Sequence, residues 1–288
     1  MKILVAGGTR FFGIPMVKSL IKDGFDVTVA TRGKTEDPFG DSVSRIIYDR
    51  HDESSTASAM KGRSFDIVID KIAYCSQDVE LLSKYLSCGR YILMSSAAVY
   101  KPMRANTPES DFNAGNYGYR LCRREDSDYG EVKRQAECAA FRTFGESGYT
   151  AVRYPVVMGK HDYTGRLQFY VSHIVNGIPM FVDDLDCEIS FIEENEAGNF
   201  LEFLVSHKVA GPVNGCSLSG ISIRSIIDFI EKRTNKKAVL SDSGDAAPYN
   251  GYEAHSTLST EIAENAGYKF SNINDWIFRL IDFYLNEL

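Results

Sequence analysis

The first thirteen residues constrain this chain more than any other stretch. Residues 3–6 form an apolar run of strand length that stops at the pair Gly7 and Gly8. After Gly13 the apolar residues recur with the period of a helix. Glycines let a backbone approach a pyrophosphate closely, and free N–H groups at a helix start point at the anion. The pattern predicts a dinucleotide-binding turn. The alternative is an ordinary strand-to-helix turn of a parallel α/β protein.

The turn also resembles a known fingerprint. Gly7-Gly8-Thr9-Arg10-Phe11-Phe12-Gly13 resembles the Gly-x-x-Gly-x-x-Gly motif of the extended short-chain dehydrogenases/reductases, the nucleotide-sugar epimerase and dehydratase group. Arg10 replaces the middle glycine, a variant that resembles an atypical branch containing the chloroplast stem-loop RNA-binding proteins. The resemblance implies an NAD(P) cofactor held by Gly7, Thr9, Arg10, Phe11, Phe12 and Gly13. Arg10 either reaches a cofactor phosphate, which suits NADP, or only caps the turn.

Alternating strands and helices with short connections follow the turn. They predict an α/β fold, a Rossmann-like doubly wound parallel sheet with a smaller C-terminal α/β region. The expected strands are residues 3–6, 25–30, 44–49, 65–70, 90–95 and 149–154, and the expected helices begin near residues 14, 79 and 129. Later segments are an amphipathic helix after 166, extended pieces at 178–182 and 188–192, and helices at 222–232 and 274–285. We expect an NAD(P)-binding Rossmann domain at 1–160 and a mainly substrate-binding region at 161–288, with 189–216 returning to the sheet.

The end of the second strand bears on the choice between NAD and NADP. NAD-preferring Rossmann enzymes place an acidic residue there for the ribose 2′-hydroxyl. This chain has Thr31 and then Arg32 instead. A guanidinium favours a 2′-phosphate, so we expect NADP, with NAD possible. The alternative is that Arg32 is an exposed surface residue.

Further cofactor contacts are implied by the resemblance alone. Residues just after the third strand border the adenine in the family, which assigns Asp49 and Arg50 by position. Lys71 and Ile72 occupy a cofactor-lining loop. Arg153-Tyr154-Pro155 resembles the family's Arg-x-Pro, which adds Tyr154, Pro155 and Val156.

Three residues are the catalytic candidates. Ser95-Ser96-Ala97-Ala98-Val99-Tyr100 resembles the family's Ser-Ser-x-x-Val-Tyr stretch, in which the second serine, here Ser96, binds substrate. Tyr129 is the only one of 16 tyrosines with a lysine four residues later, Lys133, and this spacing puts both on one helix face. A neighbouring ammonium should lower the pKa of the phenol. The family resemblance makes Tyr129 the proton acceptor, while Lys133 holds the nicotinamide ribose.

Two other stretches are less defined. Residues 101–127 form a long polar loop, and such a loop in a compact domain is usually functional or disordered. Arg166 is a candidate contact for a substrate phosphate, with a solvated surface charge as the alternative.

Composition limits the remaining classes. The 288 residues carry a net charge of −7, which disfavours a general nucleic-acid binder. Six cysteines without Cys-x-x-Cys spacing are typical of reduced thiols, and no metal site is expected. No apolar run reaches membrane-spanning length, and the opening strand leaves no room for a signal peptide, so we expect a cytoplasmic protein.

These observations favour an NAD(P)-dependent epimerase or reductase acting on a small-molecule nucleotide sugar. The residues at 97 and 98 are alanines, whereas a dehydratase usually carries an Asp-Glu pair there. The sequence leaves open whether the protein forms a homodimer. The alternative is a non-catalytic NADP-sensing or RNA-binding protein on the same fold.

Overall fold

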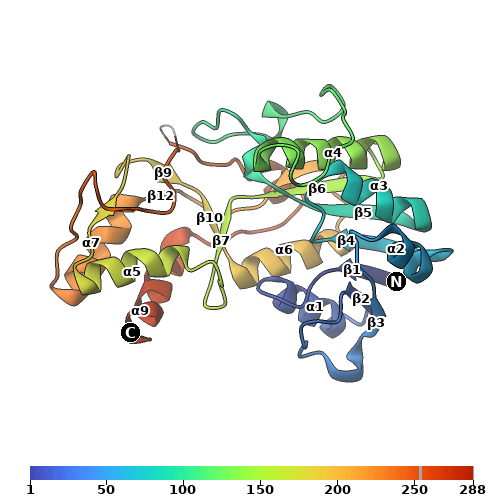
Figure 1. The fold of residues 1–288 in the computed structure, drawn as a ribbon, viewed down its shortest axis with the longest axis horizontal. Coiled ribbons are helices and arrows are strands. Elements are labelled where there is room, and N and C mark those ends of the chain that lie inside the picture. The colour runs from blue at the N-terminus through green and yellow to red at the C-terminus, as the bar shows by residue number, and fades with distance from the viewer. Residues whose placement is uncertain (253–254, 288) are drawn as a thin grey trace.

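The computed structural model describes residues 1–252 and 255–287. Its centre is a seven-stranded parallel sheet in the order β11-β6-β5-β4-β1-β2-β3 (Figure 1). The strand order reverses between β1 and β4, which is where a doubly wound sheet places its ligand. The predicted fold class is therefore confirmed. The strands of this sheet are β1 Lys2–Ala6, β2 Asp26–Thr31, β3 Ser44–Ile47, β4 Arg63–Asp70, β5 Leu86–Ser96, β6 Tyr149–Tyr154 and β11 Gly211–Asn214.

Side-chain alternation along β1 sets the two helical layers. Ile3 and Val5 enter the core beneath one pair of helices, while Leu4 and Ala6 enter the core on the opposite face. Because β1 is buried on both faces, its sequence is continuously apolar. The first layer holds α1 Gly13–Lys22 and α6 Glu194–Ser206, and the second holds α2 Glu53–Met60, α3 Ser76–Tyr85 and α4 Tyr129–Phe144.

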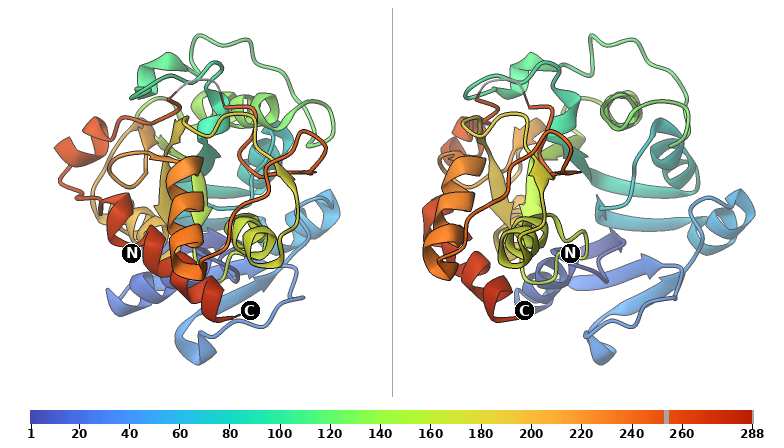
Figure 2. Two further views of the ribbon diagram at one scale, coloured as in Figure 1. Left: turned by 90° about the vertical axis from the view of Figure 1, so that its left-hand side faces the viewer. Right: turned by 60° about the vertical axis from the view of Figure 1, so that its left-hand side comes forward.

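The second part of the chain has a core of its own. Apolar residues of α5, α7 and α9 pack together there, and Figure 2 shows the orange and red helices gathered on one side of the blue and cyan strands. The helices of this core are α5 Arg166–Asn176, α7 Ile223–Thr234 and α9 Ile277–Asn286. The short helix α8 Glu261–Asn265 instead packs against β11 and the core of the large sheet. The short strands are β7 Val156–Met158, β8 Met180–Phe181, β9 Glu188–Ile189, β10 Phe191–Glu193, β12 Ile221–Ser222 and β13 Asp245–Ala246.

Two segments of the second part differ from expectation. The single strand expected at 188–192 is divided at Ser190, because β9 pairs with β12 whereas β10 pairs with β7. The last helix was expected from residue 274, but a 3-10 turn, Ile273–Asp275, precedes α9. Trp276 separates the two, and its backbone angles of φ −133° and ψ −33° are not helical. No described helix is both long and apolar enough to cross a membrane.

A buried ion pair fixes the long loop 101–127 to the sheet. Arg153 Nη2 on β6 lies 2.7 Å from Glu137 Oε2 on α4, and both side chains are fully buried. The guanidinium also donates to the carbonyl oxygens of Glu109 and Phe112 at 2.8 and 2.9 Å. These two residues belong to the loop, so one arginine joins a strand, a helix and the loop.

This pair should contribute strongly to stability. Glu137→Gln leaves the Arg153 charge without its counter-ion, and we expect a loss of about 3–5 kcal/mol in the free energy of unfolding. Urea denaturation followed by circular dichroism measures it. Glu53→Gln is the matched control, because Glu53 pairs with Lys84 at 2.6 Å on the surface and its loss should matter little. Equal effects of the two substitutions would contradict this account.

Candidate active site

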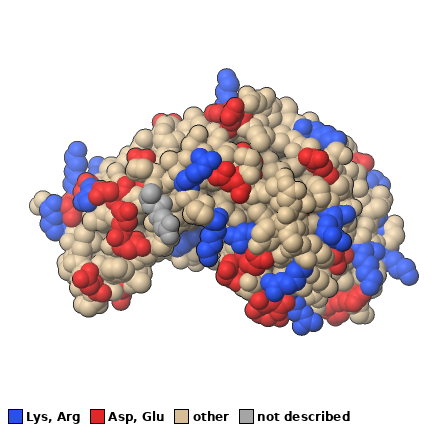
Figure 3. Space-filling view, turned by 90° about the horizontal axis from the view of Figure 1, so that it is seen from above, with Lys and Arg blue, Asp and Glu red and all other residues tan. Residues whose placement is uncertain are grey.

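A cavity of about 790 Å³ lies where the carboxyl ends of β5 and β6 meet the second part of the chain. Its lining combines the fingerprint turn, the end of β5, the start of α4 and several residues of the second part. Lys101 and Arg166 are its charged lining residues, and no acidic residue lines it among those described. Figure 3 shows the molecular outline hollowed between the two parts. The lining residues central to the site are Phe11, Phe12, Ser96, Tyr129, Pro155, Val156, Arg166 and Ser190.

The fingerprint turn depends on two close backbone approaches. Gly7 has a φ of +92°, and a Cβ there would lie 2.9 Å from Ile72 Cγ2. A Cβ on Gly13 would lie 2.7 Å from the Cα of Gly8. Side chains at these positions would therefore open the turn.

The N–H groups of this turn divide into two sets. Those of Gly13 and Ile14 donate to the carbonyl oxygens of Arg10 and Phe11. The sequence predicted free N–H groups at the start of the helix, and these two are not free. Among the described residues, no hydrogen bond uses the N–H of Phe11 or Phe12. These two donors, rather than the first turn of α1, fit a cofactor pyrophosphate.

Ser96 and Tyr129, two of the three catalytic candidates, both line the cavity. A glycine explains how α4 reaches the end of β5. A Cβ on Gly130 would lie 2.4 Å from the carbonyl oxygen of Ala98, so only glycine allows this approach. Asp128 caps the helix by accepting a hydrogen bond from the N–H of Glu131 at 2.8 Å. The Tyr-Gly-x-x-Lys pattern is therefore a packing requirement as well as a chemical one.

The pKa of Tyr129 differs from the sequence expectation. Burial raises the pKa of its phenol above the ordinary value, whereas a lowered value was expected from Lys133. A hydrogen bond with Ser96 acts in the opposite direction, as do the charges of two arginines, Arg124 and Arg166. The ammonium of Lys133 is 5.9 Å from the centre of the tyrosine ring.

Lys133 lies beneath the cavity and is fully buried. Its ammonium donates to the carbonyl oxygens of Ala73 at 2.8 Å and Met94 at 2.9 Å. Burial lowers the pKa of this ammonium to about 8. The residue therefore joins α4 to the ends of β4 and β5 behind Tyr129.

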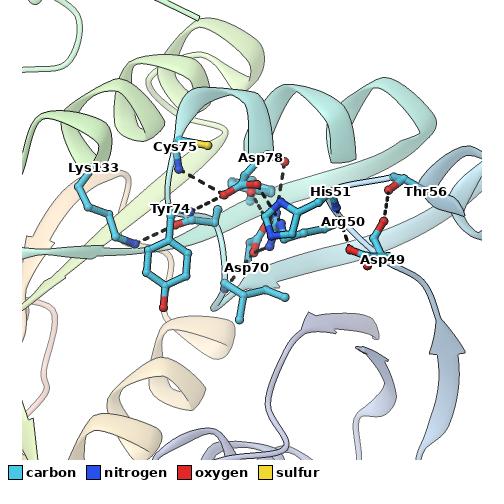
Figure 4. A network of polar contacts seen from close by, with 12 residues as sticks. Asp49, Arg50, His51, Thr56, Asp70, Tyr74, Cys75, Asp78 and Lys133 are labelled. Carbon is cyan, nitrogen blue, oxygen red and sulfur yellow. Dashed lines mark hydrogen bonds and ion pairs between the residues drawn. The ribbon is translucent and has the colours of Figure 1, made fainter. Parts of the chain in front are cut away.

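Arg50 does not face the cavity, and its assignment to the cofactor is wrong for the side chain. The guanidinium is buried and makes two hydrogen bonds of 2.9 Å with Asp70, as Figure 4 shows. Its Nε is 3.3 Å from Asp78 Oδ1. Burial acts to raise the pKa of Asp70, but the charge of Arg50 and the hydrogen bonds that the carboxylate accepts together hold that pKa below its usual value. The Arg50 side chain therefore links β4 to α3 through Asp70 and Asp78.

Two other candidate cations lie at the end of β2. Arg10 Nη2 donates to Thr35 Oγ1 at 3.1 Å, so Arg10 reaches the loop that follows Arg32. Arg32 is exposed, and among the described residues it forms no hydrogen bond or ion pair. Asp49 is occupied locally, since its carboxylate accepts from the N–H of His51 at 3.0 Å.

The remaining candidates surround the turn and the cavity. The Lys71 ammonium lies 3.9 Å from the ring centre of Phe12, and burial lowers its pKa to about 8. The Tyr154 hydroxyl donates to the carbonyl of Ala197 at 2.7 Å, so this residue is structural although its ring lines the cavity. Arg166 Nε donates to Thr164 Oγ1 at 2.9 Å at the cavity wall.

Sequence reasoning missed two residues beside the tyrosine. Tyr74 faces Tyr129 with ring centres 6.4 Å apart. The Arg124 guanidinium lies 5.2 Å from the Tyr129 ring centre. Neither stands in a motif, and Arg124 comes from a loop whose path has no periodic signal. Among the described residues, no group of three His, Cys, Asp or Glu side chains is placed to hold a metal ion.

Comparison with known proteins agrees with this fold. No family model matches the chain. Over 113 residues the chain is 35% identical to a chloroplast stem-loop binding protein of 41 kDa from Arabidopsis thaliana. That match covers 34% of this chain and 30% of the relative.

Solved structures match over the whole length. UDP-glucose 4-epimerase from Thermotoga maritima, with UDP-glucose, has a TM-score of 0.76 and 18% identity, covering 100% of this chain and 99% of that one. The Thermus thermophilus UDP-glucose 4-epimerase complex with NAD has a TM-score of 0.70 and 15% identity, covering 100% of both chains. The fold that the resemblance to the extended short-chain dehydrogenase/reductase group implied is thus confirmed. The similarity of the chain to these epimerase structures is a similarity of fold.

The buried ammonium gives a prediction about stability. Lys133→Met removes the donor for two carbonyl oxygens, and we expect a loss of about 2 kcal/mol in the free energy of unfolding without cofactor. Urea denaturation measures it, with Lys84→Met as the control because Lys84 is exposed. An unchanged stability would mean that the two carbonyls find other donors.

Proposed function

We propose that the protein is an NAD(P)-dependent epimerase or reductase that acts on a nucleotide sugar. One observation carries the proposal: Ser96 and Tyr129 line the same cavity as the fingerprint turn, although they come from separate parts of the chain. The turn would hold the cofactor pyrophosphate through its open N–H donors, and Pro155 and Val156 would border the nicotinamide.

The charge of the cavity is consistent with an anionic substrate. Lys101 and Arg166 line it in a chain whose net charge is −7. A diphosphate-linked sugar has the matching charge. UDP-glucose and NAD appear in the complexes of the similar epimerases, which supports the same ligand classes here.

In this reaction Tyr129 exchanges a proton with a sugar hydroxyl. The nicotinamide supplies the hydride acceptor and donor when it is bound. Ser96 orients the hydroxyl by hydrogen bonding. A phenol with a raised pKa stays protonated at neutral pH, so Tyr129 holds the proton that reduction of a keto sugar would consume. Acting as a base requires nearby positive charge to stabilise the phenolate.

A non-catalytic NADP-sensing or RNA-binding protein is the second candidate. The local match to the stem-loop binding protein favours it. The net charge of −7 weighs against it, as does the face in Figure 3, where acidic and basic side chains are interspersed. Incubating the protein with nucleotide sugars and NADP, followed by mass spectrometry, tests for turnover. Retention on an RNA column without turnover would favour the second candidate.

The first functional prediction concerns the phenol. Tyr129→Phe removes the hydroxyl but keeps the ring, so turnover should fall ~10²–10⁴-fold with little change in cofactor affinity. Tyr117→Phe is the control, since Tyr117 is similarly exposed and its hydroxyl binds Glu131 outside the cavity. Wild-type turnover in the Tyr129 variant would falsify the mechanism.

The second prediction concerns NADP. Arg32→Ala should weaken NADP binding by about 1.5–3 kcal/mol and leave NAD binding unchanged, because only NADP has the 2′-phosphate. Arg10→Gly should also weaken NADP binding, because Arg10 reaches the same loop. Calorimetric titration of both cofactors measures the difference.

Arg45→Ala is the control for that titration. Asp37 already occupies its guanidinium at 2.7 and 3.0 Å, so its loss should leave NADP affinity unchanged. Equal affinity of the unmodified protein for NAD and NADP would refute the cofactor assignment.

A further inference from the structure

The long loop 101–127 places a guanidinium over the tyrosines of the site. The Arg124 guanidinium carbon is 5.2 Å from the ring centre of Tyr129 and 5.6 Å from that of Tyr74. Both distances fall within the range in which a cation is attracted by an aromatic face. The arginine therefore contacts the pair of rings rather than one alone.

The backbone before Arg124 is anchored, so this placement is built into the fold. Ser76 Oγ, at the start of α3, donates to the carbonyl oxygen of Arg120 at 2.9 Å. The same hydroxyl accepts from the N–H of Cys122 at 2.7 Å, and Gln77 N–H donates to the carbonyl of Cys122 at 3.2 Å. Cys122 is buried, which holds this end of the loop against α3.

The side chain of Arg124 has no competing partner. Among the described residues, it forms no hydrogen bond or ion pair. The neighbouring Arg123 differs, since its Nε donates to Gln77 Oε1 at 3.2 Å. Arg124 is thus a charge whose interactions are with the two rings.

We propose that Arg124 is a positioning residue for Tyr129, orienting its ring and stabilising its phenolate. The inference rests on the proposed function, in which the phenolate accepts the proton of a sugar hydroxyl and becomes the phenol again. The attraction between a cation and the ring grows when the ring gains a full negative charge, so the phenolate benefits more than the phenol.

Lys133 is less suited to this task by itself. Its ammonium is farther from the ring centre, at 5.9 Å, and is shared between two carbonyl oxygens. Three other groups face Tyr129. The charge of Arg166 on α5 lowers the pKa of Tyr129, as the charge of Arg124 does, and so does the hydrogen bond with Ser96. An ionised Tyr74 has the opposite effect.

Titration of Tyr129 itself tests the proposal without turnover or cofactor. The ultraviolet absorbance of tyrosinate is followed against pH in the protein and in Tyr129→Phe, and the difference isolates the Tyr129 titration. The same difference is taken on Arg124→Met, Arg124→Lys and Arg123→Met backgrounds. Arg123→Met is the matched control, because that arginine is adjacent and also exposed but binds Gln77.

We expect Arg124→Met to raise the titration midpoint by about half a pH unit. Arg124→Lys should restore most of the shift because it retains the charge, and Arg123→Met should leave the midpoint unchanged. At pH values below that midpoint, Arg124→Met should lower kcat for oxidation of a sugar hydroxyl about threefold, with KM little changed.

An unchanged midpoint in Arg124→Met would overturn the proposal. A rise in KM with an unchanged midpoint would also overturn it and make Arg124 a substrate contact. Failure of the proposed function has a different signature, which is wild-type turnover in Tyr129→Phe whatever the titration shows.

Discussion

The buried ion pair between Arg153 and Glu137 connects the elements that carry the candidate site. The carboxylate accepts a hydrogen bond of 2.5 Å from Ser95, the neighbour of Ser96. Glu137 lies one helical turn after Lys133, and Arg153 lies two residues before Pro155. Removing two charges from water is costly unless their remaining hydrogen bonds are satisfied. Here the loop carbonyls and a tyrosine hydroxyl satisfy the arginine, so the pair is stable only when strand, helix and loop are all in place.

Glycines are as important to the site as its charged residues, because they let backbones approach closely. The start of α4 approaches the end of β5 because Gly130 has no Cβ to meet Ala98. The fingerprint turn closes on itself because Gly13 has none to meet Gly8. The ion pair fixes which elements are neighbours, and the glycines fix how closely their backbones approach. Together these contacts bring a serine and a tyrosine from distant segments to one cavity.

Much of this architecture could be predicted because its signals are local. The apolar runs and glycine turns predicted the Rossmann sheet, and the spacing of Tyr129 with its downstream lysine predicted their helix. The partners of buried charges are not local: Arg50 binds Asp70, and Lys133 donates to carbonyl oxygens on β5 and in the loop after β4. The family resemblance implied a cofactor contact for Arg50, but its guanidinium pairs with the buried Asp70. The pKa of Tyr129 also depends on tertiary packing, because burial raises it more than the hydrogen bond with Ser96 and the charges of Arg124 and Arg166 lower it.

The loop 101–127 shows how a segment without periodicity becomes part of a site. Its middle is held by Arg153 and its end by Ser76, so its path is determined by contacts with regular elements. The loop thus runs from the buried ion pair to Arg124, which lies near the rings of Tyr74 and Tyr129. Arg166, which lines the cavity, belongs to α5, and α5 packs in the second core. The two arginines thus reach Tyr129 from parts of the chain with separate cores. The electrostatic environment of the phenol therefore depends on how the second part docks against the Rossmann sheet, and on more than α4 alone.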